Sequence, residues 1–321
     1  MRIVMTALLA LGLMAMAPVV SAQPPAKPAA PPAKKVQKPP TPEELARRAE
    51  AQKKQLAEET VKVEKALADI KAPAQPKKPR KLLVYTACKG FPHDSIPIAA
   101  KAIQLMGVKT GAYEATISDC PDIFAPEKLC AFDAVFADNL TGNWLPDEKL
   151  KASLLAFVRG GKGIGGNHGT ADSFYQWKDY GDMIGGYFAG HPFGQITVKL
   201  DDPKSPINAV FGGNGFDFSD EIYTFKTPYS REKLHLLLSV DMEKSTKVRD
   251  AIAKAGEKWN NRKDGDFALS WIHKYGEGRV FYTAFGHQHY VFWTPMMLQH
   301  FLAGIQYTLG DLPAEDAPSA K

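Results

Sequence analysis

Single histidines stand directly after apolar runs that the sequence predicts as strands. The clearest is His168, which ends the glycine-rich stretch "GGKGIGGNH" at 160–168, and His287 follows the apolar run "VFYTAFG". In an open α/β sheet, ligands bind outside the carboxyl ends of the strands, so residues at these positions meet at one edge. Histidine there offers acid–base chemistry near neutral pH, or a ligand for zinc and similar metals.

Two further histidines extend this group. His93 follows the first apolar run of the body in "KGFPHDS", and His191 ends "GGYFAGH". Four separate loops therefore predict imidazoles on one rim, which is a stronger indication than any single histidine. The other four histidines are set aside. His289 lies one residue too far from a strand end, and three lie inside apolar patterns: His235, His273 and His300.

Carboxylates near these histidines bear on the choice between acid–base catalysis and metal binding. The nearest are Asp172 and the pair Asp220–Glu221 in "FSDEIYTF". Two or three histidines with a carboxylate form an open catalytic metal site. The chain has no HExxH motif and no short histidine spacing on one helix. The sequence thus permits a divalent metal such as zinc without requiring one.

Aromatic side chains crowd the same segments and indicate a sugar ligand. Trp177 follows the His168 turn and Tyr223 follows Glu221. Sugars present hydroxyls for hydrogen bonds and C–H faces for aromatic rings, so aromatics beside carboxylates and amides suit them. Taken singly, however, each of these aromatics fits core packing better than a ligand site.

Alternating strands and helices must position these residues. Strands are predicted at 81–87, 112–118, 132–138 and 162–166, and helices at about 95–106 and 147–159. This alternation favours a parallel, doubly wound α/β sheet. Beyond residue 190 we expect added strands at 195–200, 234–240 and in a hairpin around 275–278, then a closing helix at 294–309.

The N-terminal part lies outside this body. Residues 1–22 have the pattern of a signal peptide cleaved near Ala22, which predicts a periplasmic or secreted protein with no transmembrane span after cleavage. A Pro/Ala/Lys-rich disordered linker at 23–40 and a long helix at 41–71 follow, and the sparse apolar stripe of that helix suggests weak self-association. Residues 72–80 are expected to be a second linker and 313–321 a disordered tail.

Charge and cysteine content narrow the function further. The net charge of +5 comes from the leader, since residues 23–80 hold 14 Lys/Arg and 7 Asp/Glu. The body is weakly acidic, so no nucleic-acid partner is expected. Of the three cysteines, Cys120 and Cys130 are close enough in sequence to pair, and Cys88 would then remain a packed thiol.

Several motifs occur together and in order. They are "GGKGIGGNHGTADSFYQWKDYGDMIGGYFAGHP", "DEIYTF" and "SWIHKYGEGRVFYTAFGHQHYVFWTPMMLQHFLAGIQYTLG". Over 81–312 the chain resembles the trehalose-utilisation (ThuA-like) family. The resemblance implies a flavodoxin-like fold of the class I glutamine amidotransferase type. In amidotransferases the corresponding turn carries a cysteine nucleophile, whereas 166–169 holds no thiol, so thiol amidase chemistry is not expected.

The resemblance also implies a role in the use of trehalose or related disaccharides and keto sugars. It points to His93, His168, Asp172, His191, Glu221 and His287. The turn "NHG" departs from the "LHA"-like run of other members, and Asn167 adds an amide there.

We expect catalysis, by isomerisation or elimination, from His168, His287, Glu221 and Asp172. We expect substrate contacts from His93, Asn167, Trp177, His191 and Tyr223, and any metal on His93, His168 and His287. One alternative is a non-catalytic carbohydrate-binding module with a small-molecule sugar as its partner. Another is a thiol enzyme that uses Cys88.

Overall fold

The computed structural model describes residues 41–260 and 262–319. The expected signal peptide and the Pro-rich linker lie outside these residues. Contacts divide the chain into two units, 1–46 and 47–321. Within the first, Thr41 and Glu44 form a capping box, since each side chain accepts from the other's backbone N–H at 3.2 and 2.9 Å. Helix α1 (Pro42–Ala66) starts there and ends five residues before the predicted boundary.

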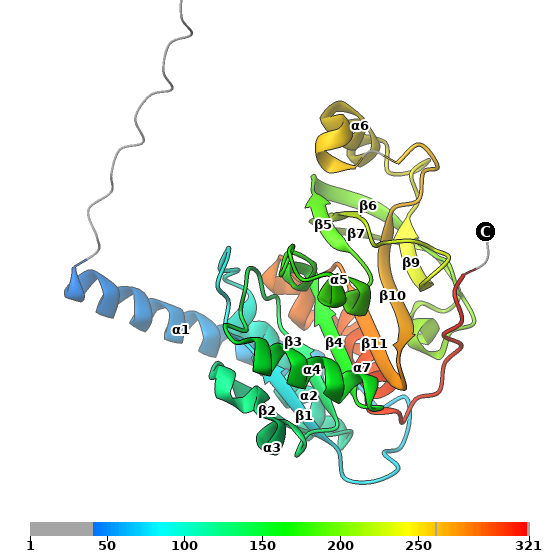
Figure 1. Ribbon diagram of the computed structural model, residues 1–321. Coiled ribbons are helices and arrows are strands. Elements are labelled where there is room, and N and C mark those ends of the chain that lie inside the picture. Colours follow the sequence, from blue (N-terminus) through cyan, green and yellow to red (C-terminus); the bar gives the residue numbers. More distant parts are fainter. Residues whose placement is uncertain (1–40, 261, 320–321) are drawn as a thin grey trace, which may run out of the picture. The chain divides into compact units, whose positions relative to one another are not determined.

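A nine-stranded sheet forms the centre of the 47–321 unit (Figure 1). Five neighbouring strands are parallel, in the order β2-β1-β3-β4-β11. This is the flavodoxin-like order. Their bounds are β1 (Lys81–Tyr85), β2 (Glu114–Ser118), β3 (Ala134–Ala137), β4 (Gly163–Asn167) and β11 (Gly278–Thr283). Strands β3 and β4 are buried at every residue, which explains their continuous runs of apolar and glycine residues.

The remaining strands are antiparallel and extend the sheet from β11 in the order β10-β9-β6-β7. The sheet is therefore mixed, and the sequence predicted three of these four added strands but not the last, β7. They are β10 (Ala268–Tyr275), β9 (His235–Val240), β6 (Phe193–Leu200) and β7 (Phe216–Glu221). A separate pair, β5 (Tyr187–Gly190) and β8 (Thr224–Lys226), was not predicted.

Helices cover both faces of the parallel strands, with α4 and α5 on one face and α2 and α7 on the other (Figure 1). Their bounds are α2 (Ile96–Thr110), α3 (Pro126–Leu129), α4 (Glu148–Arg159), α5 (Lys178–Ile184), α6 (Thr246–Ala255) and α7 (Pro295–Leu309). Short 3-10 turns lie at Pro121–Phe124, His168–Ala171, Pro206–Phe211, Gly256–Trp259 and His289–Trp293. Within 41–260 and 262–319, no helix is long and apolar enough to span a membrane.

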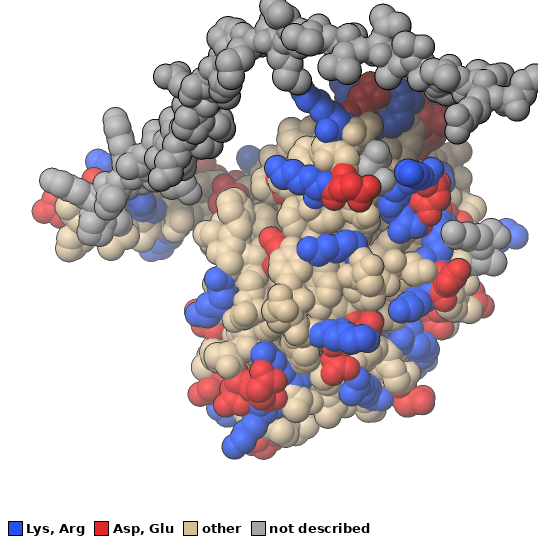
Figure 2. Space-filling view, turned by 45° about the horizontal axis from the view of Figure 1, so that its top comes forward, with Lys and Arg blue, Asp and Glu red and all other residues tan. Residues whose placement is uncertain are grey.

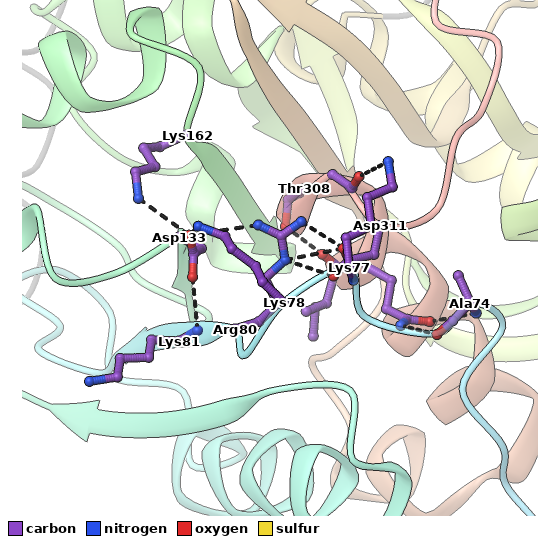
Figure 3. A network of polar contacts seen from close by, with 12 residues as sticks. Ala74, Lys77, Lys78, Arg80, Lys81, Asp133, Lys162, Thr308 and Asp311 are labelled. Atoms are coloured by element: carbon purple, nitrogen blue, oxygen red, sulfur yellow. Dashed lines mark hydrogen bonds and ion pairs between the residues drawn. The ribbon is translucent and has the colours of Figure 1, made fainter.

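The segment predicted as a linker at 72–80 is bound along the body (Figure 3). Ala74 exchanges two hydrogen bonds with the Gln306 side chain, at 3.1 and 2.6 Å. Arg80 donates to both oxygens of Asp311, the shortest contact being 2.6 Å. Lys78 lies 2.9 Å from Asp133. The linker prediction is therefore wrong, because its prolines and lysines follow a surface that offers them partners.

The prediction for the C-terminal tail also needs correction. The tail expected to be disordered from 313 reaches β9, where the Ser319 N–H donates to the Leu234 carbonyl at 2.9 Å and the Ala317 carbonyl lies 2.8 Å from His235 Nδ1. Cys120 and Cys130 are free thiols, both exposed. On the face drawn in Figure 2, basic and acidic side chains are interspersed.

Candidate functional site

Loops from the carboxyl edge of the sheet enclose a cavity of about 280 Å³. It is lined by Phe91, His93, Asp172, Phe188, His191, Glu221, Tyr223 and His287. Six of the nine predicted site residues thus face one cavity. A seventh, His168, is fully buried beside it, with its ring 3.9 Å from that of Tyr223. The expectation that separate strand-end loops converge is confirmed for this group.

His168 occupies the first position after β4, where the backbone turns sharply. Its φ is +35°, and a β-carbon on the next residue, Gly169, would come within 2.7 Å of the Asn139 carbonyl oxygen. The Tyr282 hydroxyl donates to the His168 carbonyl at 2.8 Å. His168 Nδ1 lies 2.9 Å from the Ala284 carbonyl, which can only accept, so this nitrogen carries the proton. His168 Nε2 therefore presents a lone pair to the site.

Three ligand-type atoms form a nearly equilateral triangle next to that lone pair. His168 Nε2 lies 3.2 Å from Glu221 Oε2 and 3.3 Å from His287 Nδ1. His287 Nδ1 lies 3.3 Å from the same carboxylate oxygen. One N–H cannot point along all these edges at once, so hydrogen bonding accounts for only part of the arrangement.

The triangle has the size that a zinc-like ion requires. Tetrahedral zinc sites have bonds of about 2.0–2.1 Å to histidine nitrogen and carboxylate oxygen, which sets neighbouring ligand atoms about 3.3–3.4 Å apart. His93 completes a group of four, with one ligand atom from each residue and all four atoms within 4.8 Å of one another. The donor set of three imidazoles and one carboxylate fits zinc or a similar divalent metal. Glu221, predicted as a catalytic residue, joins the three predicted metal ligands.

The electrostatics leave the ligand atoms ready to bind a cation. Burial would raise the pKa of the Glu221 carboxyl, but the close imidazoles of His168 and His287 hold it well below its usual range. Burial and the two neighbouring imidazoles lower the pKa of His93 to about 3, so its ring is neutral. His93 Nδ1 is buried and has no hydrogen-bond partner among the residues that the structure describes. A buried lone pair without a partner is costly unless a ligand satisfies it.

Two further titratable groups face the cavity. His191 Nδ1 lies 3.1 Å from Glu221 Oε1, the carboxylate oxygen outside the triangle. Burial lowers the pKa of His191. Burial also raises the pKa of Asp172, which accepts a 2.5 Å hydrogen bond from the Tyr175 hydroxyl. These groups can exchange protons with a ligand without taking part in the triangle.

Two further residues hold the site together: Asn139, which the sequence did not indicate, and Asp220, which it indicated only as a carboxylate beside Glu221. The Asn139 side chain donates to Ser95 Oγ and to the Gly286 carbonyl, and accepts from the Gly169 N–H, at 2.8–2.9 Å. Asp220, buried beside Glu221, accepts from the N–H groups of Gly286 and Gln288. Asp220 opens the "DEIYTF" motif, whereas Asn139 belongs to none of the motifs, although its position just after β3 is a strand-end signal like that of His168.

The two remaining predicted residues lie elsewhere, and so does the cysteine of the thiol-enzyme alternative. Asn167 is buried behind the site, where its Oδ1 accepts from the Asn139 N–H at 2.8 Å. Trp177 packs against Tyr180 and Phe174 in an aromatic cluster away from the cavity lining. The Cys88 thiol lies 3.1 Å from the Phe91 carbonyl, and none of the cavity's lining residues is a cysteine. This placement does not support the thiol-enzyme alternative.

The histidines that were set aside fall into two groups. His235, His273 and His300 are buried with polar partners, as expected of core residues. His289 is different, because it lies two residues from His287 and contacts side chains of other elements.

Strand order and site together define a flavodoxin-like α/β protein with a histidine–glutamate cluster at the carboxyl edge of its sheet. The model of the ThuA family, described as trehalose utilisation, matches residues 81–308, and the chain belongs to this family. Helix α1 lies outside the matched region.

Solved structures agree on the fold. A ThuA-like protein from Bacteroides uniformis has a TM-score of 0.56 at 18% identity, over 73% of this chain and 93% of that one. A ThuA-like protein from Parabacteroides merdae has a TM-score of 0.54 at 15% identity, over 74% and 93% of the two chains. None of the curated proteins compared with the chain matches it.

Proposed function

We propose that this protein is a divalent-metal enzyme of carbohydrate metabolism that isomerises a sugar or a keto sugar, or eliminates a group from it. The observation that carries the proposal is the triangle of His168 Nε2, His287 Nδ1 and Glu221 Oε2, with edges of 3.2–3.3 Å. Membership of a trehalose-utilisation family supports a carbohydrate ligand. The predicted signal peptide extends the proposal to a periplasmic or secreted location, which cell fractionation would test.

The chemistry follows from which groups face the cavity. A bound divalent ion supplies a Lewis acid for a carbonyl or hydroxyl oxygen. Asp172 and His191 lie on the cavity wall and are placed to take a proton from the carbon beside that carbonyl and to return one. Return to the neighbouring carbon gives isomerisation, whereas departure of a substituent from the next carbon gives elimination.

The walls favour one sugar ring. Phe91, Phe188 and Tyr223 contribute flat apolar faces, and the volume of about 280 Å³ is at the small end of the range for ligand sites. The second ring of a disaccharide would then lie outside, near Phe91, whose side chain is 61% exposed. Phe91 thus offers a stacking surface at the mouth of the cavity.

Metal analysis is the first test. We expect about one zinc or similar divalent ion per chain in the wild type after reconstitution, and loss of that ion in His168→Ala. His300→Ala is the matched control, since His300 is equally buried but lies in the core. A wild-type protein that binds no divalent ion at micromolar concentration would overturn the metal assignment.

Proton transfer is the second test. Keto sugars and keto disaccharides incubated in D₂O should acquire deuterium beside the carbonyl. We expect Asp172→Asn to abolish this exchange while it retains the metal, because the Asp172 carboxyl is not in the ligand group. Saturable sugar binding without exchange or product would favour the alternative of a carbohydrate-binding module, which the aromatic walls also suit.

A further inference from the structure

A bridge of side chains joins helix α1 to the two loops that carry His93 and His287. The Glu59 carboxylate lies 2.9 and 3.0 Å from His289 Nδ1. The other ring nitrogen, Nε2, lies 3.1 Å from Asp94 Oδ1. Asp94 follows His93 directly, and His289 is two residues from His287. One imidazole therefore connects the His93 loop, the His287 loop and the helix.

The helix is held against the body by more than this bridge. Val63 is fully buried, and Leu67 and Ile70, just beyond the helix end, are 2% and 8% exposed. The Lys62 ammonium lies 4.6 Å from the centre of the Trp293 ring. Glu59 itself is only 8% exposed and accepts from Gln55 Nε2 at 3.0 Å. Burying a carboxylate is costly unless it is paired, so the contact with His289 has a structural purpose.

The same two loops are also joined on the inner side. Ser95 Oγ donates to the Gly286 carbonyl at 2.8 Å. The His93 and His287 loops are therefore clamped twice, by Ser95–Gly286 from within and by Asp94–His289 from outside. His93 completes the ligand group outside the 3.2–3.3 Å triangle, within the 4.8 Å limit of the four ligand atoms. The Asp94–His289 contact can therefore determine how close His93 lies to the other three ligand residues.

We propose that Glu59 is a positioning residue of the site, which acts through His289 and Asp94 to set the spacing of His93 and His287. Helix α1 then helps to position the ligand residues of the site, although it lies outside the region 81–308 that the family model matches. The inference rests on the proposed function for the metal that the two histidines hold, but the clamp itself is independent of any metal.

The test compares two adjacent glutamates in the full chain. Glu59→Gln keeps the shape of the side chain and removes its charge. Glu58→Gln is the matched control, because the Glu58 side chain is 65% exposed and 4.0 Å from Lys54. We expect Glu59→Gln to weaken Zn²⁺ binding, measured by competition with a chelator, about tenfold, as for other outer-shell partners. The visible spectrum of the Co²⁺-substituted protein should change as well.

A second variant guards against a folding defect. Asp94→Asn removes the other carboxylate of the clamp, and the Asp94 side chain is 85% exposed, so its cost in stability is small. We expect it to weaken Zn²⁺ binding in the same direction, and the double variant to show less than the product of the two effects because both act through His289. Thermal unfolding confirms that each variant is folded.

A metal-independent measurement separates failure of this inference from failure of the proposed function. In metal-free protein with labelled histidines, Glu59→Gln should shift the NMR signals of His93 and His287 but not those of His235 and His273. If these shifts occur and the wild type binds no Zn²⁺, the clamp stands and the metal assignment fails. If Glu59→Gln matches Glu58→Gln in both the NMR shifts and the Zn²⁺ affinity, the positioning role is overturned.

Discussion

The two ends of the parallel strands carry charged clusters of opposite design. At the amino end, all four oxygens of Asp133 and Asp311 have partners. Asp311 receives Arg80 and the Lys77 N–H. Asp133 receives Lys78 and Lys162 on one oxygen and a backbone N–H on the other. The carboxylate oxygens of this cluster are thus all paired. The cluster holds the segment before β1 against the end of α7 (Figure 3).

At the carboxyl end the balance is reversed. The imidazoles of His93, His168 and His287 converge with the carboxylate of Glu221, and in the described part of the chain His93 Nδ1 is buried without a hydrogen-bond partner. Polar groups that satisfy one another stabilise a fold, whereas converging ligand atoms that cannot all be satisfied by one another's protons form a site for a ligand. The comparison therefore assigns stability to one cluster and binding to the other, and each assignment can be tested by substitution.

The largest effect on stability is expected at the amino end. Arg80→Ala leaves the Asp311 carboxylate, whose side chain is fully buried, without its guanidinium. Breaking a buried pair from one side costs about 3–5 kcal/mol. We expect that loss in the free energy of unfolding measured with urea, with Zn²⁺ affinity unchanged in the folded protein.

Lys78→Ala is the control for this result. The Lys78 side chain is 58% exposed, so its pair with Asp133 should contribute only about 0–1 kcal/mol. A similar loss of stability in both variants, or a drop in metal affinity in Arg80→Ala, would contradict the division of labour between the two ends.

An intermediate case lies at Asn139, where stability and binding should fall together. Its side chain joins Ser95, Gly286 and Gly169, which belong to the His93, His287 and His168 loops. Asn139→Gly removes these bonds but tolerates the left-handed backbone, with φ of +53°. We expect a loss of about 1–3 kcal/mol, because buried polar groups are left unpaired, and weaker Zn²⁺ binding.

Asn208→Gly is the control for this variant, since Asn208 is also fully buried and bonded to two carbonyls, of Asp202 and Leu237. It should lower the free energy of unfolding by a similar amount without weakening Zn²⁺ binding. Equal loss of metal affinity in both variants would mean that any destabilisation of the fold weakens Zn²⁺ binding. A specific role of Asn139 in positioning the ligand loops would then be contradicted.

Much of the site could be predicted because its signals are local. His168 and His287 each stand directly after a buried strand, and a parallel sheet brings such positions to one edge. Glu221 ends strand β7, beside a tyrosine that faces the same cavity. In these cases the neighbouring residues alone indicate a strand and show that the candidate residue lies at its carboxyl end.

The errors arise where a contact depends on distant segments. Trp177 has the same local pattern as Tyr223, yet it packs with Tyr180 instead of facing the cavity. His289 was set aside for its spacing, but its partner Glu59 lies 230 residues earlier in the chain. The 72–80 segment has a linker's composition, and only its position beside Asp133 and Asp311 gives it structure. Periodicity shows which face of an element is buried, but not which remote loop covers it.

The smallest effect provides a pH test of the amino-end cluster. Burial would raise the pKa of Asp133, but Lys78, the Lys81 N–H and Lys162 together lower it. A carboxyl whose pKa is lower in the folded state stabilises the fold above its unfolded pKa of about 4, and this contribution disappears as the pH falls through the folded pKa. Asp133→Asn should therefore cost about 1–2 kcal/mol at pH 7.

That cost should shrink as the pH falls from about 4 toward the lower folded pKa, below which the folded wild-type carboxyl is also protonated and resembles the amide. The measurement is the free energy of unfolding in urea from pH 7 to pH 2 for both proteins. Asp217→Asn gives a baseline, since Asp217 pairs only with the Thr197 hydroxyl in an exposed position and has no cation partner in the described residues. If the difference in the free energy of unfolding between wild type and Asp133→Asn stays constant across this range, the shape of the Asp133 side chain, and not its charge, stabilises the fold. The contrast between the paired amino end and the unpaired carboxyl end would then have no electrostatic basis.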